Sequence, residues 1–204
     1  MSDPVWRRWT LFAGIVVLAA GYLCAYVLFV VRSADFIFAR SERDARVFSR
    51  EHPLALPAHF DFGAQSGGAA RLGGGWHAAE PIGAWSDAHS AWTHVAVQAC
   101  GCDLRLRISG AVYTSTRTPQ NRIAVIVNGK SLADVVRDEK NAGATIELRV
   151  PRAVAETGIL DIELRLQTIA SPLREQTGAD SRKLGFLLHS IDAAAADDAA
   201  PTPP

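Results

Sequence analysis

The sequence of 204 residues has no excess of charge of either sign, only three cysteines, and none of the short motifs of common enzymes. Lysine and arginine together number 21, as do aspartate and glutamate, so the basic excess of a general nucleic-acid-binding protein is missing. The patterns G-x-S-x-G, H-E-x-x-H, G-x-x-x-x-G-K-S/T and G-x-G-x-x-G do not occur. We therefore predict no enzyme activity, no cofactor and no nucleic-acid partner; paired carboxylates of the glycosidase type are the one catalytic arrangement left open.

The scarcity of cysteine also limits metal and redox chemistry. Cys100-Gly101-Cys102 is the only close pair, and a C-x-C needs two further ligands to bind zinc, which no second pair supplies. Two small buried residues or a structural disulfide at the glycine is the preferred interpretation, and a redox pair is the alternative. No metal site is predicted, because the nearby histidines match no ligand spacing; they are His77, His89 and His94.

The one long apolar run covers residues 9–31, without a charged side chain. As a helix of 23 residues it would be about 34 Å long, enough to cross a hydrocarbon core of ~30 Å. A cleaved signal peptide would have a shorter apolar stretch and a small-x-small site after it, and both are missing. We predict an uncleaved transmembrane helix after an N-terminal segment, residues 1–8.

Residues 32–71 are predicted to be a juxtamembrane helix followed by a linker. The helix ends before Pro53, and a glycine-rich stretch follows. Four arginines, spaced so that they share one helix face, are candidates for contact with anionic lipid headgroups or a polyanion; they are Arg40, Arg43, Arg46 and Arg50. The alternative is a solvated helix with pairs such as Glu42–Arg46.

Residues 72–192 alternate between apolar and polar side chains, for example at 104–108, 123–127 and 160–166. Asn128-Gly129 is a strong signal for a two-residue hairpin turn. Many short alternating strands predict an all-β domain, an antiparallel β-sandwich of the jelly-roll type. The low-complexity tail, residues 193–204, is predicted to be disordered.

The segment 75–87, GWHAAEPIGAWSD, is the densest candidate for a binding site. Tryptophan faces stack on sugar rings and nearby acids accept hydrogen bonds from hydroxyls, so this mixture favours a glycan. The predicted ligand-binding residues are Trp76, Glu80, Trp85, Asp87 and Asn128. In the alternative, both tryptophans fill one end of the sandwich and Glu80 bonds turn amides. The long loop 168–183 is either a second binding element or a strand connection pinned by Arg182.

The same segment resembles a bacterial pattern, G-W-x-x-P-E-x-W-G-x-W-S. Three later segments resemble further parts of it in order: residues 120–129 look like Q-x-x-x-V-x-V-N-G with one residue more after the glutamine, 171–172 match S-P, and 180–185 match D-x-R-x-L-G. The pattern belongs to a domain of unknown function that is associated with membrane glycosyltransferases and phosphoglycerol transferases of the bacterial envelope. The order Glu80-Pro81 is reversed here, and Ile82 stands where an aromatic residue is usual.

The resemblance implies a jelly-roll accessory domain outside the membrane, without catalytic residues. Arginines flank both ends of the apolar run, so charge alone leaves the orientation open. With the resemblance, we expect a single-pass protein of the bacterial inner membrane, with a cytoplasmic N-terminus and a periplasmic sandwich. Its expected function is glycan binding in envelope polysaccharide or glycolipid assembly. The alternative is a structural subunit that binds a polytopic membrane glycosyltransferase or phosphoglycerol transferase through its helices, without a ligand of its own.

Overall fold

The computed structural model of the chain describes residues 5–143 and 145–196, without the side chains of residues 5–15 and 31–37. It divides into two units, Met1–Arg40 and Ser41–Pro204. The first unit contains most of helix α1, which runs as one helix from Val5 to Glu51. Pro53 follows closely and disfavours helical geometry at the residue before it, which explains where α1 ends.

The two helices predicted at residues 9–31 and after residue 32 are therefore one continuous helix. All described side chains from residue 16 to residue 30 are exposed. Within the part of the chain that the structure describes, no helix is both long and apolar enough to cross a membrane. Several side chains of the predicted span lie outside the described residues, and membrane crossing stays a prediction.

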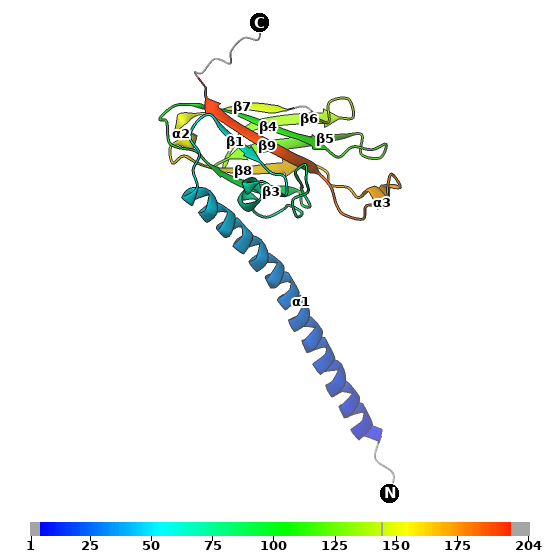
Figure 1. The fold of residues 1–204 in the computed structure, drawn as a ribbon. Coiled ribbons are helices and arrows are strands. Elements are labelled where there is room, and N and C mark those ends of the chain that lie inside the picture. Colours follow the sequence, from blue (N-terminus) through cyan, green and yellow to red (C-terminus); the bar gives the residue numbers. More distant parts are fainter. Residues whose placement is uncertain (1–4, 144, 197–204) are drawn as a thin grey trace. The chain divides into compact units, whose positions relative to one another are not determined.

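The second unit is an antiparallel sandwich of two sheets (Figure 1). The five-stranded sheet has the order β1-β9-β4-β7, and β2 also pairs with β9. The four-stranded sheet has the order β3-β8-β5-β6. The strands are β1 (Ala58–Asp61), β2 (Ala84–Trp85), β3 (Ser90–Ala96), β4 (Leu104–Val112), β5 (Gln120–Val127), β6 (Lys130–Asp138), β7 (Ile146–Val150), β8 (Ile159–Leu166) and β9 (Phe186–Ala195). Without the two-residue β2, consecutive strands alternate between the sheets except for β5 and β6, which pair with each other in the four-stranded sheet. This is the strand order of a jelly roll, and it confirms the sandwich part of the fold prediction.

The core lies between the sheets and is made by the alternating apolar residues. Leu106 on β4, Ile123 on β5 and Leu160 on β8 are each completely buried. Their polar neighbours along the strands point outward, as the period of two requires. Three short helices complete the unit: η1 (Gly67–Arg71), α2 (Arg152–Ala155) and α3 (Pro172–Glu175).

The sandwich extends beyond the predicted range 72–192 at both ends. Strand β1 precedes the range and pairs with β9, and β9 itself continues to Ala195. The first alanines of the predicted tail are therefore strand residues, because β4 supplies hydrogen-bonding partners as far as Leu104, opposite Ala195. Residues 197–204 lie outside the described residues.

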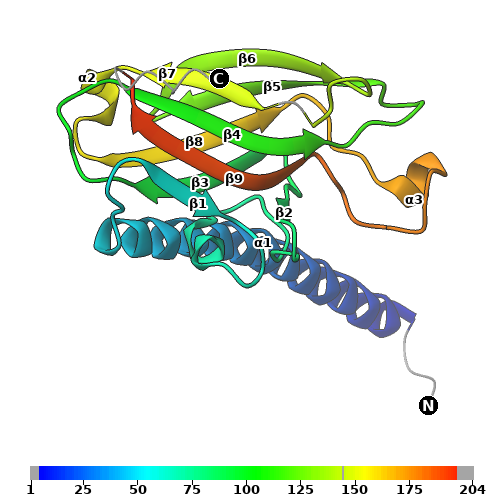
Figure 2. The same cartoon turned by 45° about the horizontal axis from the view of Figure 1, so that its top comes forward.

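The C-terminal turns of α1, from residue 41, lie against β3, which is an edge strand of its sheet (Figure 2). The hydroxyl of Ser49, which is completely buried, donates to the carbonyl of His94 at 2.5 Å. Leu54 bonds to the edge of β3 through the carbonyl of Ala96. Unpaired strand edges invite association with other chains, and these segments cover this one.

Candidate functional site

The two tryptophans of the predicted glycan site lie in different environments. Trp76 packs against the core, and its Nε1 donates to the carbonyl of Trp92 at 2.6 Å. Trp85 pairs with Leu187 across β2 and β9, and the next residue, Leu188, points into the core. Alternation therefore places Trp85 and Leu187 on the outer face of the sheet. Leu187 is only 5% exposed there, while Trp85 is half-buried, so Trp85 alone offers part of its ring to solvent.

Glu80 and the loop 168–183 are joined by a charged clip. Arg182 Nη1 donates to Glu80 Oε1 at 2.5 Å, and Arg182 Nη2 lies 2.8 Å from Asp180 Oδ2. The hydrogen bonds from Arg182 lower the pKa of Asp180, and the two carboxylates raise the pKa of Arg182. The loop is therefore a connection pinned by Arg182, in agreement with the second interpretation of its sequence.

Other residues of the sequence pattern also bond to one another. The Oγ of Ser86 accepts from the N–H of Phe186 at 2.8 Å, and the side chain of Asn121 makes two hydrogen bonds with the backbone of Thr168. Ser171 donates to the carbonyl of Ser181 at 3.1 Å. Segments of the sequence pattern that lie far apart along the chain are thus joined by hydrogen bonds that hold the loops. The bond between Glu80 and Arg182 joins residues 102 positions apart.

Asn128 lies away from the other residues of the predicted glycan site. It lies at the end of β5 in the four-stranded sheet, with φ of 49°, as the predicted hairpin turn requires. Its Nδ2 donates to the carbonyls of Val154 and Ile159 at 2.7 and 2.8 Å, and its Oδ1 accepts from the N–H of Asp161 at 2.8 Å. Asp87, by contrast, follows Trp85 closely and is half-buried. Backbone pairing folds the segment 75–87 back on itself, with Trp76 opposite Ser86 and Glu80 opposite Gly83, whereas Asn128 lies on the other sheet.

His94, to which sequence analysis assigned no role, lies in a buried network of charged side chains. Its side chain points from β3 toward α1 and is 3% exposed. Nδ1 lies 2.8 Å from Asp161 Oδ1, and Nε2 lies 2.7 Å from Glu42 Oε2. Because both ring nitrogens face carboxylate oxygens, both must carry a proton to complete these bonds, which makes the ring a cation. Burial lowers the pKa of His94, but the bonds with Asp161 and Glu42 outweigh it, and the pKa is raised.

One of the four predicted arginines of α1 pairs with the sandwich, and contact of the four with lipid or a polyanion stays a prediction. Arg46 Nη2 lies 2.9 Å from Asp161 Oδ2 and so belongs to the His94 network. Arg43 and Arg50 are exposed, and Arg40 falls in the first unit. The sequence did contain a signal for the docked face, because Glu42, Ala45, Arg46 and Ser49 follow helical spacing and include two small residues.

Arg71 is a second buried contact between α1 and the sandwich. Its guanidinium carbon lies 5.3 Å from the ring centre of Phe48 on α1 and 5.0 Å from that of Phe60 on β1. Its Nη2 donates to the carbonyl of His52 at 2.7 Å. The side chain is buried, and this desolvation lowers the pKa of Arg71.

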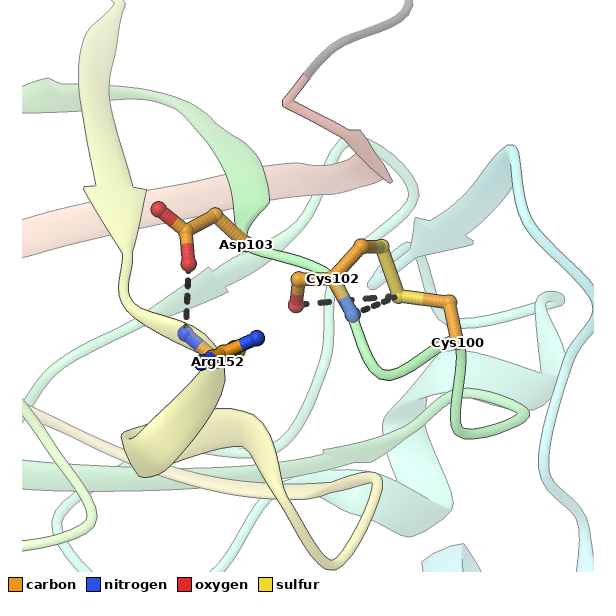
Figure 3. Close-up of a disulfide and its surroundings, with 4 residues drawn as sticks. All are labelled: Cys100, Cys102, Asp103 and Arg152. Carbon is orange, nitrogen blue, oxygen red and sulfur yellow. Dashed lines mark hydrogen bonds between the residues drawn. A yellow bond between two sulfur atoms is a disulfide. The ribbon is translucent and has the colours of Figure 1, made fainter.

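Cys100 and Cys102 form a disulfide in the loop between β3 and β4, with Cα atoms 5.2 Å apart (Figure 3). Cys24, on α1, is a free and exposed cysteine. In the part of the chain that the structure describes, no group of three or more histidine, cysteine or acidic residues could hold a metal ion. The three neighbouring histidines separate: His77 bonds the carbonyl of Lys183 and His89 that of Leu166, while His94 faces its carboxylates.

A shallow hollow of about 340 Å³ lies on the polar outer face of β1, β9 and β4. His59, Arg105, Arg107 and Asp192 are among its lining residues, and no aromatic ring other than the imidazole of His59 lines it. It therefore lacks the flat apolar surface on which sugar rings stack, and Trp85 remains the better candidate for glycan contact.

No family model and no curated protein matches the chain. Among solved structures it is similar to a family 36 carbohydrate-binding module in complex with calcium and xylotriose, with 12% identity, a TM-score of 0.37 and coverage of 60% of this chain and 92% of the module. A family 35 carbohydrate-binding module from an environmental isolate gives 16% identity, a TM-score of 0.37 and coverage of 72% and 99%. The Podospora anserina mannanase with a family 35 module gives 16%, 0.34, and coverage of 72% and 26%. All three TM-scores are below 0.5, so the fold assignment depends on the strand order described above.

Proposed function

We propose that the chain is a single-pass membrane protein and a structural subunit of an envelope glycosyltransferase or phosphoglycerol transferase, which it binds through its N-terminal helix rather than through the sandwich. The observation that carries this proposal is the docking of the last turns of α1 onto β3 through Glu42, His94 and Asp161. Through these contacts residues 41–51 belong to the same compact unit as the sandwich.

The membrane anchor is the sequence 9–31, which has no charged residue. The described part of it, residues 16–30, exposes large apolar side chains such as Leu18 and Phe29, at 75% and 71%. Extended apolar surface of this kind is unfavourable in water and favourable in lipid or against another membrane helix. The expected location is the bacterial inner membrane, with the sandwich in the periplasm.

Exchange of the two units tests this function, and the structure supplies the boundary. One chimera replaces residues 9–40 with an unrelated membrane helix and keeps residues 41–51 with the sandwich they contact. The other keeps residues 1–40 and replaces the sandwich. We expect a polytopic transferase, identified by mass spectrometry with the wild-type chain, to co-purify with the second chimera and to be lost from the first. The opposite pattern would place partner binding in the sandwich and contradict the proposal.

Glycan binding at the outer face around Trp85 is the second candidate function. The observations that favour it are the partly exposed Trp85 on the outer face, Asp87 two residues later and the Glu80–Arg182 pair in the same chain segment, since acids and guanidinium groups both bond sugar hydroxyls. Trp76 and Asn128 are excluded from this smaller site because their polar atoms already bond the backbone.

Trp85→Ala is expected to weaken binding to an array of bacterial envelope glycans by about fivefold, because stacking on an aromatic ring contributes about 1 kcal/mol. The matched control is Trp76→Phe, which removes the Nε1 bond and should lower thermal stability without changing glycan binding. Loss of the native circular dichroism spectrum in Trp85→Ala would show that this ring is needed for the fold, and would remove the candidate site.

A further inference from the structure

The disulfide between Cys100 and Cys102 has no part in the anchor or in the candidate glycan site. It lies in the loop between β3 and β4, and Figure 3 shows it beside the contact of Asp103 with Arg152. Only one residue separates the two cysteines, so the bond closes a very short chain loop. A disulfide stabilises a fold chiefly by restricting the unfolded chain, and the gain is smallest for short loops. This disulfide is therefore expected to add little to the stability of the fold.

The two halves of the disulfide differ in how firmly they are held. Cys102 is half-buried and packs against the core. The next residue, Asp103, accepts hydrogen bonds from the N–H of Arg152 at 2.8 Å and from Arg149 Nε at 2.7 Å. These bonds fix the Cys102 side of the loop to the neighbouring strand and helix.

The Cys100 side is open to solvent. Cys100 is exposed, and Gly101 between the cysteines has φ of 64° with no atom within 4 Å of the position of an added Cβ. An incoming thiolate can therefore reach the sulfur of Cys100 without displacing core residues. Exposed disulfides of this kind are the ones that exchange readily.

The surroundings also favour a thiolate on Cys100 once the bond opens. The N–H of Cys102 donates to Cys100 Sγ at 3.2 Å, and the same N–H is placed to stabilise negative charge on that sulfur. The carboxylate of Asp103, the residue after Cys102, would oppose such a charge, but its own charge is compensated by the guanidinium of Arg149.

We propose that Cys100-Gly101-Cys102 is a thiol–disulfide exchange site that oxidises cysteine pairs of other proteins, a property beyond the proposed function. A substrate thiolate attacks Cys100 Sγ, the bond between the two cysteines breaks, and Cys102 leaves as a thiolate that takes a proton from water. The second thiol of the substrate, after losing its proton, attacks the mixed disulfide and releases Cys100. Two electrons pass from the substrate dithiol to the module, which ends as a dithiol while the substrate gains one disulfide.

The test uses the full chain in detergent with Cys24→Ser, which removes the third thiol. Reduced, unfolded ribonuclease is the dithiol probe, and thiols are counted by maleimide labelling and mass spectrometry. We expect one ribonuclease disulfide for each disulfide lost from the chain, with an unchanged circular dichroism spectrum. In single-cysteine variants, Cys102→Ser should form a mixed disulfide with oxidised glutathione about tenfold faster than Cys100→Ser, because its remaining thiol is the exposed one.

Two results would overturn the proposal. The first is a disulfide that stays intact with ribonuclease and glutathione until the chain is unfolded by urea, or whose reduction itself unfolds the sandwich, since the bond would then be structural. The second is equal or faster reaction at Cys102, which would contradict the assignment of Cys100 as the attacked sulfur.

Discussion

Replacement of His94 with leucine is expected to lower the free energy of unfolding by about 3 kcal/mol, at the lower end of the range for breaking a buried ion pair. Leucine is close to histidine in volume, so the substitution leaves no large cavity. The loss of stability comes from Glu42 and Asp161, because their carboxylates would repel each other without the imidazolium between them. Both carboxylates are themselves largely buried, at 21% and 19% exposure, and water can replace the lost bonds only in part. The measurement is urea unfolding of the full chain in detergent, followed by tryptophan fluorescence.

The chain contains a matched control for this variant. His59 lies 2.6 Å from Asp192, a similar pair in geometry, but its side chain is 61% exposed. Exposed ion pairs contribute little, and His59→Leu should change the free energy of unfolding by less than about 0.5 kcal/mol. Addition of Glu42→Gln to His94→Leu should restore part of the loss, because it removes one of the two carboxylate charges that face the position of His94. Equal effects at His94 and His59 would contradict the importance of the buried network.

The same network gives the wild-type chain a pH dependence with a defined sign. The folded pKa of His94 is raised from 6.5, so its stabilising effect is complete below pH 6.5 and is lost as pH rises through the folded value. Burial opposes ionisation of Asp161, but His94 and Arg46 lower its pKa from 3.8, so its contribution is lost on acidification. Stability should therefore decline above pH 6.5 in the wild type, and His94→Leu should remove most of that decline.

Arg71→Ala is expected to cost about 2–3 kcal/mol, the range for truncating a large buried side chain that also loses a hydrogen bond. The substitution removes the guanidinium between Phe48 and Phe60 and leaves the carbonyl of His52 without this donor. Thermal unfolding of the full chain in detergent measures the effect.

Arg43→Ala is the control, because Arg43 is an exposed arginine of the docked segment of α1. It should change stability by less than about 0.5 kcal/mol. Arg71→Met retains the packing between the rings and should be milder than Arg71→Ala. If Arg71→Ala were as mild as Arg43→Ala, the ring contacts would contribute nothing to holding α1 on the sandwich.

The strands and the jelly roll were predictable from sequence because the period of two is a local property of each strand. The alternation of Leu104, Leu106 and Ile108 is enough to predict β4. Asn128-Gly129 likewise predicts the turn that the structure contains. The docking of α1 was not predictable in the same way, because it depends on which strand the helix meets. Arg46 illustrates this: a local pair with Glu42 was one expectation, whereas Asp161 on β8 binds it at 2.9 Å.

The candidate site was predictable only in part for a related reason. A sequence segment places Trp76 and Trp85 close together along the chain, but the short strand β2 turns Trp85 outward while Trp76 packs on the core. The sequence predicts that Glu80 bonds a glycan or turn amides, whereas in the structure Arg182, 102 positions later, donates to it. The same residue types can bind a glycan or hold loops together, and only the tertiary contacts show which of these two roles a given side chain has.

The most direct test of the proposed anchoring is a fusion of alkaline phosphatase after Pro204, expressed in a bacterium and combined with alkaline carbonate washing of membranes. Phosphatase folds to its active form only after export. The proposal predicts an active reporter that remains in the washed membrane pellet, and loss from the pellet when residues 9–31 are deleted. An inactive reporter, or an active one released by the carbonate wash, would contradict a periplasmic sandwich on a membrane-spanning helix.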